Sequence, residues 1–217
     1  SREVQEDSVF FALAGERTDG HRYISDAFES GALAAVAEVE SLSKDPGWFL
    51  ALAPWLKRKI IFVEDSLQAL QDTARSWLTR FSEITLIGVT GSCGKTTTKE
   101  LIASVISQEH KTVKSPGNRN SVIGLPLSLF EVRQHHRYGV FEMGVSQPGE
   151  MEQLASLVPP EIGIVTNIGT AHIGNFGSSE QIAREKGRIF SRGAGLAYIQ
   201  EECPWKEELV SGRNLQM

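Results

Sequence analysis

Residues 88–97 read Gly-Val-Thr-Gly-Ser-Cys-Gly-Lys-Thr-Thr, and we call this segment the phosphate loop. It follows an apolar run and opens a helical pattern. Glycines let successive backbone N–H groups converge on an anion, and a helix N-terminus adds partial positive charge. Lys95 can reach terminal phosphates and the Thr96 hydroxyl can bind Mg²⁺, so the segment predicts a nucleotide phosphate site. The alternative is an ordinary strand-to-helix turn with an exposed lysine.

The glycine spacing of this segment departs from the general pattern Gly-x-x-x-x-Gly-Lys-Ser/Thr. The first glycine of that pattern would fall on Val89, whereas the glycines here are Gly88, Gly91 and Gly94. The Lys-Thr pair that opens the helix is kept. The segment therefore indicates phosphate binding without distinguishing ATP from GTP.

Glu142 is a candidate metal ligand, and His172 and Lys186 follow it along the chain. Glu142 ends the apolar run 138–142, His172 follows the apolar run 162–166 by a short loop, and Lys186 lies in a predicted helix. Parallel sheets present ligand residues at the carboxyl ends of their strands, so Glu142 and His172 should share one edge. A carboxylate is a hard oxygen ligand that suits Mg²⁺. Taken alone, these residues have ordinary alternatives: an exposed carboxylate, a satisfied histidine and a solvated lysine.

The elements that must position these residues follow from hydrophobic periodicity. The second part of the chain predicts strands at 84–89, 138–142 and 162–166 and helices at 96–108, 122–130 and 150–157. Strands that alternate with helices at this spacing predict an α/β fold with a parallel sheet and crossover helices.

The first part of the chain predicts a small mixed α/β domain. The expected strands are 9–13, 34–37 and 60–63, and the expected helices are 25–30 and 66–81. Ser66 is the expected N-cap of the last helix. We place the domain boundary near Ser82, which gives domains 1–82 and 83–217. Trp48, Trp55 and Trp77 are expected to fill the core of the first domain.

The composition of the chain limits its partners and its compartment. Its 217 residues carry 22 Lys and Arg against 27 Asp and Glu, a formal net charge of −5. This balance argues against nucleic acid or an anionic membrane as the main partner. Cys93 and Cys203 fit neither a disulfide framework nor a zinc motif, and no secretory signal or membrane-length apolar run is present, so we expect a cytoplasmic protein. The opening at Ser1 without Met indicates a piece of a longer protein.

Several ordered segments resemble one family, the Mur ligases, which build the peptide of bacterial cell-wall precursors. The phosphate loop has the family's shortened glycine spacing. Three later segments agree in order: Gly117–Pro126 with its Asn-Arg-Asn, Phe141–Gly144 with Glu-Met-Gly, and Thr166–Phe190 with Ala-His and Phe-Gly-Ser. Residues 11–21 resemble the family's uridine-nucleotide domain. Within the family, the segments most resemble the ligase that adds D-alanyl-D-alanine.

The resemblance implies an ATP-dependent ligase that forms an amide bond through an acyl phosphate, with UDP-N-acetylmuramoyl peptide and D-alanyl-D-alanine as substrates. It also implies a monomer that uses two Mg²⁺ ions. ATP would contact Gly91, Ser92, Cys93, Gly94, Lys95, Thr96, Thr97 and Asn120. The metal ligands would be Thr96, Glu142, His172 and Lys186, with Lys186 carbamylated. Lys95, His172 and Lys186 would carry the catalysis.

In the first domain, the resemblance makes Ser1, Arg2, Asp19 and His21 candidates for contacting the uridine diphosphate. These residue types are equally common in turns. Two other functions remain open: a generic P-loop ATPase or kinase with a regulatory first domain, and a nucleotide-binding fragment that acts without catalysis.

Overall fold

The computed structural model describes residues 4–15, 18–192 and 195–211. The chain forms two compact units, Ser1–Asp72 and Thr73–Met217. The division falls inside helix α5 (Ser66–Leu78), ahead of the boundary near Ser82 that the sequence suggested.

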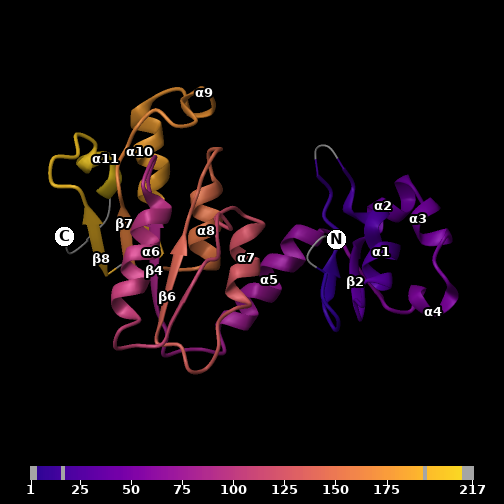
Figure 1. Ribbon diagram of the computed structural model, residues 1–217. Coiled ribbons are helices and arrows are strands. Elements are labelled where there is room, and N and C mark those ends of the chain that lie inside the picture. Colours follow the sequence, from indigo (N-terminus) through magenta and orange to yellow (C-terminus); the bar gives the residue numbers. More distant parts are fainter. Residues whose placement is uncertain (1–3, 16–17, 193–194, 212–217) are drawn as a thin grey trace. The chain divides into compact units, whose positions relative to one another are not determined.

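The first unit is built on a three-stranded parallel sheet in the order β1-β2-β3 (Figure 1). Its strands are β1 (Val9–Phe11), β2 (Ala34–Glu38) and β3 (Ile60–Val63). Its helices are the 3₁₀ helix η1 (Gly20–Tyr23), α1 (Ile24–Glu29), α2 (Val39–Lys44), α3 (Gly47–Leu50), α4 (Pro54–Lys57) and the start of α5. Small side chains such as Ala12, Ala35 and Ala37 pack with Ile24 and Leu52 in the core. All three predicted strands form.

The prediction that three tryptophans fill this core is wrong for two of them. Trp48 packs against the core, but Trp55 is 68% exposed. Consecutive helical side chains point in different directions, and Leu56 is the α4 residue that packs inward. Trp77 belongs to the second unit, where its indole N–H donates to the Val132 carbonyl at 3.3 Å.

The second unit contains a five-stranded sheet in the order β5-β6-β4-β7-β8, with every pair parallel. The strands are β4 (Thr85–Thr90), β5 (Thr112–Lys114), β6 (Tyr138–Glu142), β7 (Ile162–Val165) and β8 (Leu196–Ile199). The helices are α6 (Lys95–Ile106), α7 (Gly124–Leu129), α8 (Glu150–Leu157), α9 (Ile173–Phe176), α10 (Ser179–Gly187), η2 (Arg188–Phe190) and α11 (Lys206–Val210). The predicted α/β fold with a parallel sheet is confirmed.

Helices cover both faces of this sheet, and the alternation of side chains along β4 shows how (Figure 1). Ile87 and Val89 pack with Ala103 of α6 on one face. Leu86 belongs to the larger core on the other face, which also contains Leu125 of α7, Leu154 of α8 and Ile182 of α10. Because successive strand residues point to opposite faces, one strand serves both layers.

The order of the strands places a topological switch point beside β4. From β4 the chain runs to the edge strand β5, returns to β6, and then crosses to β7 on the other side of β4. Ligands of such sheets bind outside the carboxyl ends of the strands at this point. Thr90, Glu142 and Val165 end β4, β6 and β7. The loops that follow them therefore meet at one edge.

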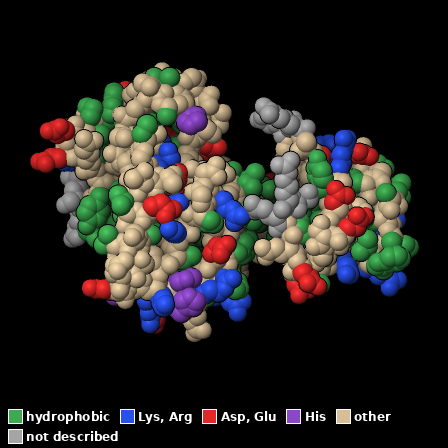
Figure 2. Space-filling model, in the orientation of Figure 1, with side chains coloured by type: hydrophobic (Ala, Val, Ile, Leu, Met, Phe, Trp, Pro, Cys, Tyr) green, Lys and Arg blue, Asp and Glu red, His purple; other side chains and the backbone are tan. Residues whose placement is uncertain are grey.

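On the face that Figure 2 shows, acidic and basic side chains are interspersed and do not form one broad basic surface. Among the described residues, no helix combines the length and the apolar character that a membrane span needs.

Candidate phosphate and metal site

The phosphate loop joins β4 to α6 through two glycines with positive φ. Gly91 has φ +146°, and a Cβ there would lie 1.9 Å from Thr166 Oγ1. Gly94 has φ +79° and precedes α6, with its carbonyl accepting from Thr98 N–H at 2.9 Å. Both conformations favour glycine. The turn therefore brings backbone N–H groups and the start of α6 to the edge of the sheet.

The segment after β7 holds this loop in place. Ser92 N–H donates to the Asn167 carbonyl at 3.0 Å, and Cys93 N–H donates to Asn167 Oδ1 at 2.9 Å. In return, Thr166 Oγ1 donates to the Cys93 carbonyl at 2.6 Å and Gly169 N–H donates to Ser92 Oγ at 2.8 Å. Four hydrogen bonds thus fix the loop before any ligand is considered.

Two lysine ammonium groups converge on one carbonyl of the loop. Lys95 Nζ donates to the Gly91 oxygen at 2.9 Å, and Lys186 Nζ, from α10, donates to the same oxygen at 3.2 Å. Lys186 is only 3% exposed. Its burial, and then the positive charge of Lys95, lower its pKa to about 8, against a smaller opposing effect of Glu185. Two cations that meet in this way create a site for a strongly charged anion.

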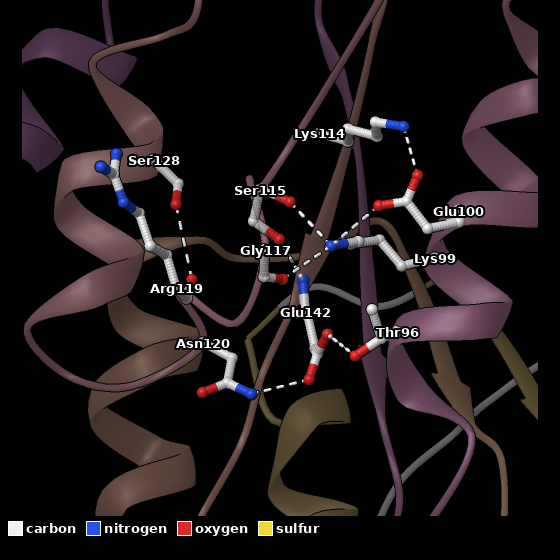
Figure 3. Close-up of polar contacts among 10 residues, drawn as sticks. All are labelled: Thr96, Lys99, Glu100, Lys114, Ser115, Gly117, Arg119, Asn120, Ser128 and Glu142. Carbon is white, nitrogen blue, oxygen red and sulfur yellow. Dashed lines mark hydrogen bonds and ion pairs between the residues drawn. The ribbon is translucent and has the colours of Figure 1, made fainter.

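Glu142 lies beside the loop at the end of β6 and is 2% exposed. Its Oε2 accepts from Thr96 Oγ1 and its Oε1 accepts from Asn120 Nδ2, each at 2.7 Å (Figure 3). Its backbone N–H donates to Ser115 Oγ at 3.0 Å. A hydroxyl and a carboxylate that face one another provide the oxygen ligands that Mg²⁺ prefers, so these residues fit the metal that the sequence suggested.

A cavity of about 250 Å³ lies against the two lysines, and neither Thr96 nor Glu142 lines it. It is lined by Gly91, Ser92, Lys95, Asn120, Ser121, Gly144, Val145, Ser146, Glu150, Ala171, His172 and Lys186. Asn120 lines the cavity and also donates to Glu142, so it bridges the cavity and the Thr96–Glu142 pair. His172 reaches the cavity from the start of α9 with φ +60°.

The structure also separates some of the expected site residues. Among the residues described, no three His, Cys, Asp or Glu side chains gather as a metal site. The four expected metal ligands include only two side chains of these types, Glu142 and His172. Cys93 and Thr97 are exposed and do not line the cavity. Cys93 contributes through its backbone contacts with Thr166 and Asn167.

In the first unit, Asp19 and His21 form an internal pair. His21 Nδ1 lies 2.5 Å from Asp19 Oδ1, and His21 Nε2 accepts from Glu38 N–H at 2.9 Å. Burial disfavours ionisation of Asp19, but hydrogen bonds from the backbone and side chain of His21 outweigh it and lower its pKa. Both ring nitrogens of the buried His21 are engaged within the first unit, and its contact with the uridine diphosphate stays a prediction. Ser1 and Arg2 lie outside the described residues.

Several residues of the site were not assigned a role from the sequence. Asn167 pins the phosphate loop, Ser115 holds the backbone of Glu142, and Glu150 lines the cavity and accepts from Ser146 N–H at 2.6 Å. Asn167 could have been found, because it follows the predicted strand 162–166 at the carboxyl edge. Ser115 follows a strand that the sequence did not reveal.

Two family matches cover most of the chain. The Mur ligase middle domain matches residues 89–215, and the catalytic domain of the Mur ligase family matches residues 1–77. Curated relatives include the UDP-N-acetylmuramoyl-tripeptide–D-alanyl-D-alanine ligases of Treponema pallidum and Synechocystis. The first is 41% identical over 88% of this chain and 41% of its own length. The second is 43% identical over 86% of this chain and 38% of its own length.

Solved structures agree with these matches. MurF of Thermotoga maritima in complex with ADP has a TM-score of 0.80 and 33% identity, over 99% of this chain and 48% of its own. MurF of Acinetobacter baumannii has a TM-score of 0.83 and 30% identity, over 96% of this chain and 44% of its own. The chain thus spans less than half the length of these relatives. The middle-domain match includes residues 89–97 of the loop, Glu142, His172 and Lys186, and with this agreement of sequence, fold and site the chain belongs to the Mur ligase family.

Proposed function

We propose that the complete gene product is an ATP-dependent ligase that joins D-alanyl-D-alanine to a UDP-N-acetylmuramoyl peptide in the cytoplasm. The supporting observation is the convergence of Lys95 and Lys186 on the Gly91 carbonyl, next to the Thr96–Glu142 pair. The site thus combines cations for a polyphosphate with oxygen ligands for Mg²⁺. The relatives named as D-alanyl-D-alanine ligases supply the substrate class.

In the proposed reaction, the γ-phosphoryl group moves to a substrate carboxylate, so that ADP leaves and an acyl phosphate forms. The amine of D-alanyl-D-alanine attacks the acyl carbon, phosphate leaves, and an amide bond results. Lys95 balances charge on the phosphates, and the backbone N–H groups at the start of α6 would donate to the phosphate oxygens. Thr96 and Glu142 would hold one Mg²⁺, which when bound neutralises phosphate charge and orients the phosphate oxygens.

His172 and Lys186 would hold the second Mg²⁺. An ammonium is not a metal ligand, so Lys186 must first become an oxygen ligand, and a carbamate does this. The pKa of Lys186, lowered to about 8 by burial and by Lys95, favours the neutral amine that reacts with carbon dioxide. Asn120 would position Glu142 and face the phosphates across the cavity.

The first unit, with Asp19 near its surface, is proposed to bind the uridine nucleotide, and we propose a monomer. We propose that the boundary between the uridine-nucleotide domain and the ATP domain lies near Ser82.

Phosphate release by the complete gene product tests this function. Release that requires both the UDP-linked muramoyl peptide and D-alanyl-D-alanine is expected. Equal release without them would instead identify a plain P-loop ATPase, and nucleotide binding without release would identify a non-catalytic module.

A further inference from the structure

Lys99 is a fully buried lysine that the proposed reaction does not use. It lies on α6 three residues after Thr96 and four after Lys95, so these side chains share one face of the helix. Its exposed fraction is 0%. Such burial of a lysine is rare unless the charge is paired and hydrogen-bonded.

The Lys99 ammonium is satisfied by three partners, one for each N–H. It donates to the Ser115 carbonyl at 2.8 Å and to the Gly117 carbonyl at 3.0 Å, and it pairs with Glu100 Oε1 at 3.2 Å (Figure 3). Lys114 also pairs with Glu100, and its hydrogen bond lowers the pKa of that carboxyl. Lys99 therefore ties α6 to the backbone of the segment that follows β5.

That segment leads directly into the proposed metal site. Ser115, whose carbonyl Lys99 holds, accepts through Oγ from the backbone N–H of Glu142. Five residues later, Asn120 donates to the Glu142 carboxylate, whose other oxygen accepts from Thr96. These hydrogen bonds thus form a closed circuit that begins and ends on α6. It runs from Thr96 through Glu142 and Ser115 to Lys99.

We propose that Lys99 is a positioning residue for Mg²⁺-dependent nucleotide binding: it fixes the segment 115–120 against α6 and so holds Glu142 and Asn120 opposite Thr96. This inference rests on the proposed function. Lys99 itself touches neither metal nor phosphate. Its loss should weaken the response to Mg²⁺ and leave the contribution of the phosphate loop in place.

The test measures ADP binding to the complete gene product by calorimetry at a series of Mg²⁺ concentrations, and without Mg²⁺. Lys99→Met keeps the length of the side chain and removes its charge and donors. We expect the Mg²⁺ concentration for half-maximal enhancement to rise about tenfold or more, as for other partners that orient metal ligands. Metal-free ADP affinity should change much less. Lys99→Arg, which restores charge and donors, should recover part of the response.

Lys114→Met is the matched control, since it removes a lysine from the same Glu100 but an exposed one. Its Mg²⁺ response should stay within about twofold of wild type, as expected for exposed ion pairs. A folded Lys99→Met protein with an unchanged Mg²⁺ response overturns the proposal. If that variant does not fold, Ser115→Ala decides: a raised Mg²⁺ requirement supports the circuit, and an unchanged one overturns it. A wild-type protein whose ADP binding ignores Mg²⁺ would instead contradict the proposed function.

Discussion

Lys95 and Lys186, from α6 and α10, donate to the same backbone oxygen, that of Gly91, at 2.9 and 3.2 Å. Two like charges at one acceptor repel each other, and burial of Lys186 adds to the penalty for its charged form. The site therefore favours anything that lowers this positive charge, either an anionic ligand or neutralisation of Lys186. Both possibilities lead to measurable predictions.

Stability should depend on pH through Lys186. Its pKa is about 8 in the folded protein against an ordinary 10.5, so the unfolded chain binds the proton more tightly. Stability therefore rises as pH increases from about 8 to about 10.5, and the penalty is complete below pH 8. Lys186→Met should exceed the wild type in unfolding free energy by about 3 kcal/mol at pH 7, with the advantage disappearing by about pH 10.5. Urea unfolding in carbon-dioxide-free buffer measures this, and a pH-independent difference would contradict it.

Lys186 should form a carbamate when nucleotide and Mg²⁺ are bound. Carbon dioxide adds to the nitrogen of the neutral amine, one N–H proton leaves to solvent, and the resulting carbamate anion relieves the repulsion with Lys95. ¹³C NMR with labelled bicarbonate should show one carbamate signal that requires ADP and Mg²⁺ and is absent in Lys186→Ala. The exposed Lys114→Ala is the control and should retain the signal. A signal that survives in Lys186→Ala would assign the carbamate elsewhere.

Loss of Lys95 should abolish phosphate release. Lys95→Ala removes the lysine that the phosphate loop itself contributes, and removal of one group that stabilises transition-state charge lowers turnover by about 100-fold or more. The measurement is phosphate release with both substrates present. Lys114→Ala should release phosphate at the wild-type rate, and a Lys95→Ala enzyme that does the same would remove the loop from the mechanism.

The carboxylate of Glu142 should set the Mg²⁺ requirement. Glu142→Gln keeps the size of the side chain and removes its negative charge, so the Mg²⁺ concentration for half-maximal ADP binding should rise about tenfold or more. The exposed Glu109→Gln serves as a charge-matched control. An unaltered Mg²⁺ titration for Glu142→Gln would rule out Glu142 as a ligand.

The turn at Gly91 should not tolerate a side chain. Gly91→Ala combines φ +146° with a Cβ placed 1.9 Å from Thr166 Oγ1. The strained backbone alone should lower the unfolding free energy by about 1–3 kcal/mol, and ADP affinity should fall with it. Gly174→Ala has open space around the new Cβ and should stay within about 0.5 kcal/mol of wild type. Thermal unfolding and calorimetry report both effects.

The sequence predicted the parts of this fold that have strong local signals. β6 and α8 have the predicted bounds, because one is a continuous apolar run and the other has clear helical spacing. β5 and the short helices α2, α3 and α4 were missed, because segments of three to six residues carry too little periodicity. The division into two compact units falls within α5, where no sequence signal marks it, since a continuous helix carries no linker composition.

The predicted site residues differ in how far local patterns could place them. The loop residues and Glu142 follow from strand ends and glycine spacing. His21 shows the limit: the resemblance suggested a ligand contact, and no local pattern reports its hydrogen bond with the backbone N–H of Glu38, 17 residues away. The links through Ser115 and Asn167 likewise join segments distant in the chain, which no local pattern reports.

The four hydrogen bonds that Thr166, Asn167 and Gly169 share with the phosphate loop have a consequence for capture of the nucleotide. A loop that already has its binding conformation loses little conformational freedom when the nucleotide binds, so more of the interaction energy remains as affinity. The loop also has a fixed size and curvature. It cannot adjust to an anion of a different shape, so such an anion should bind more weakly.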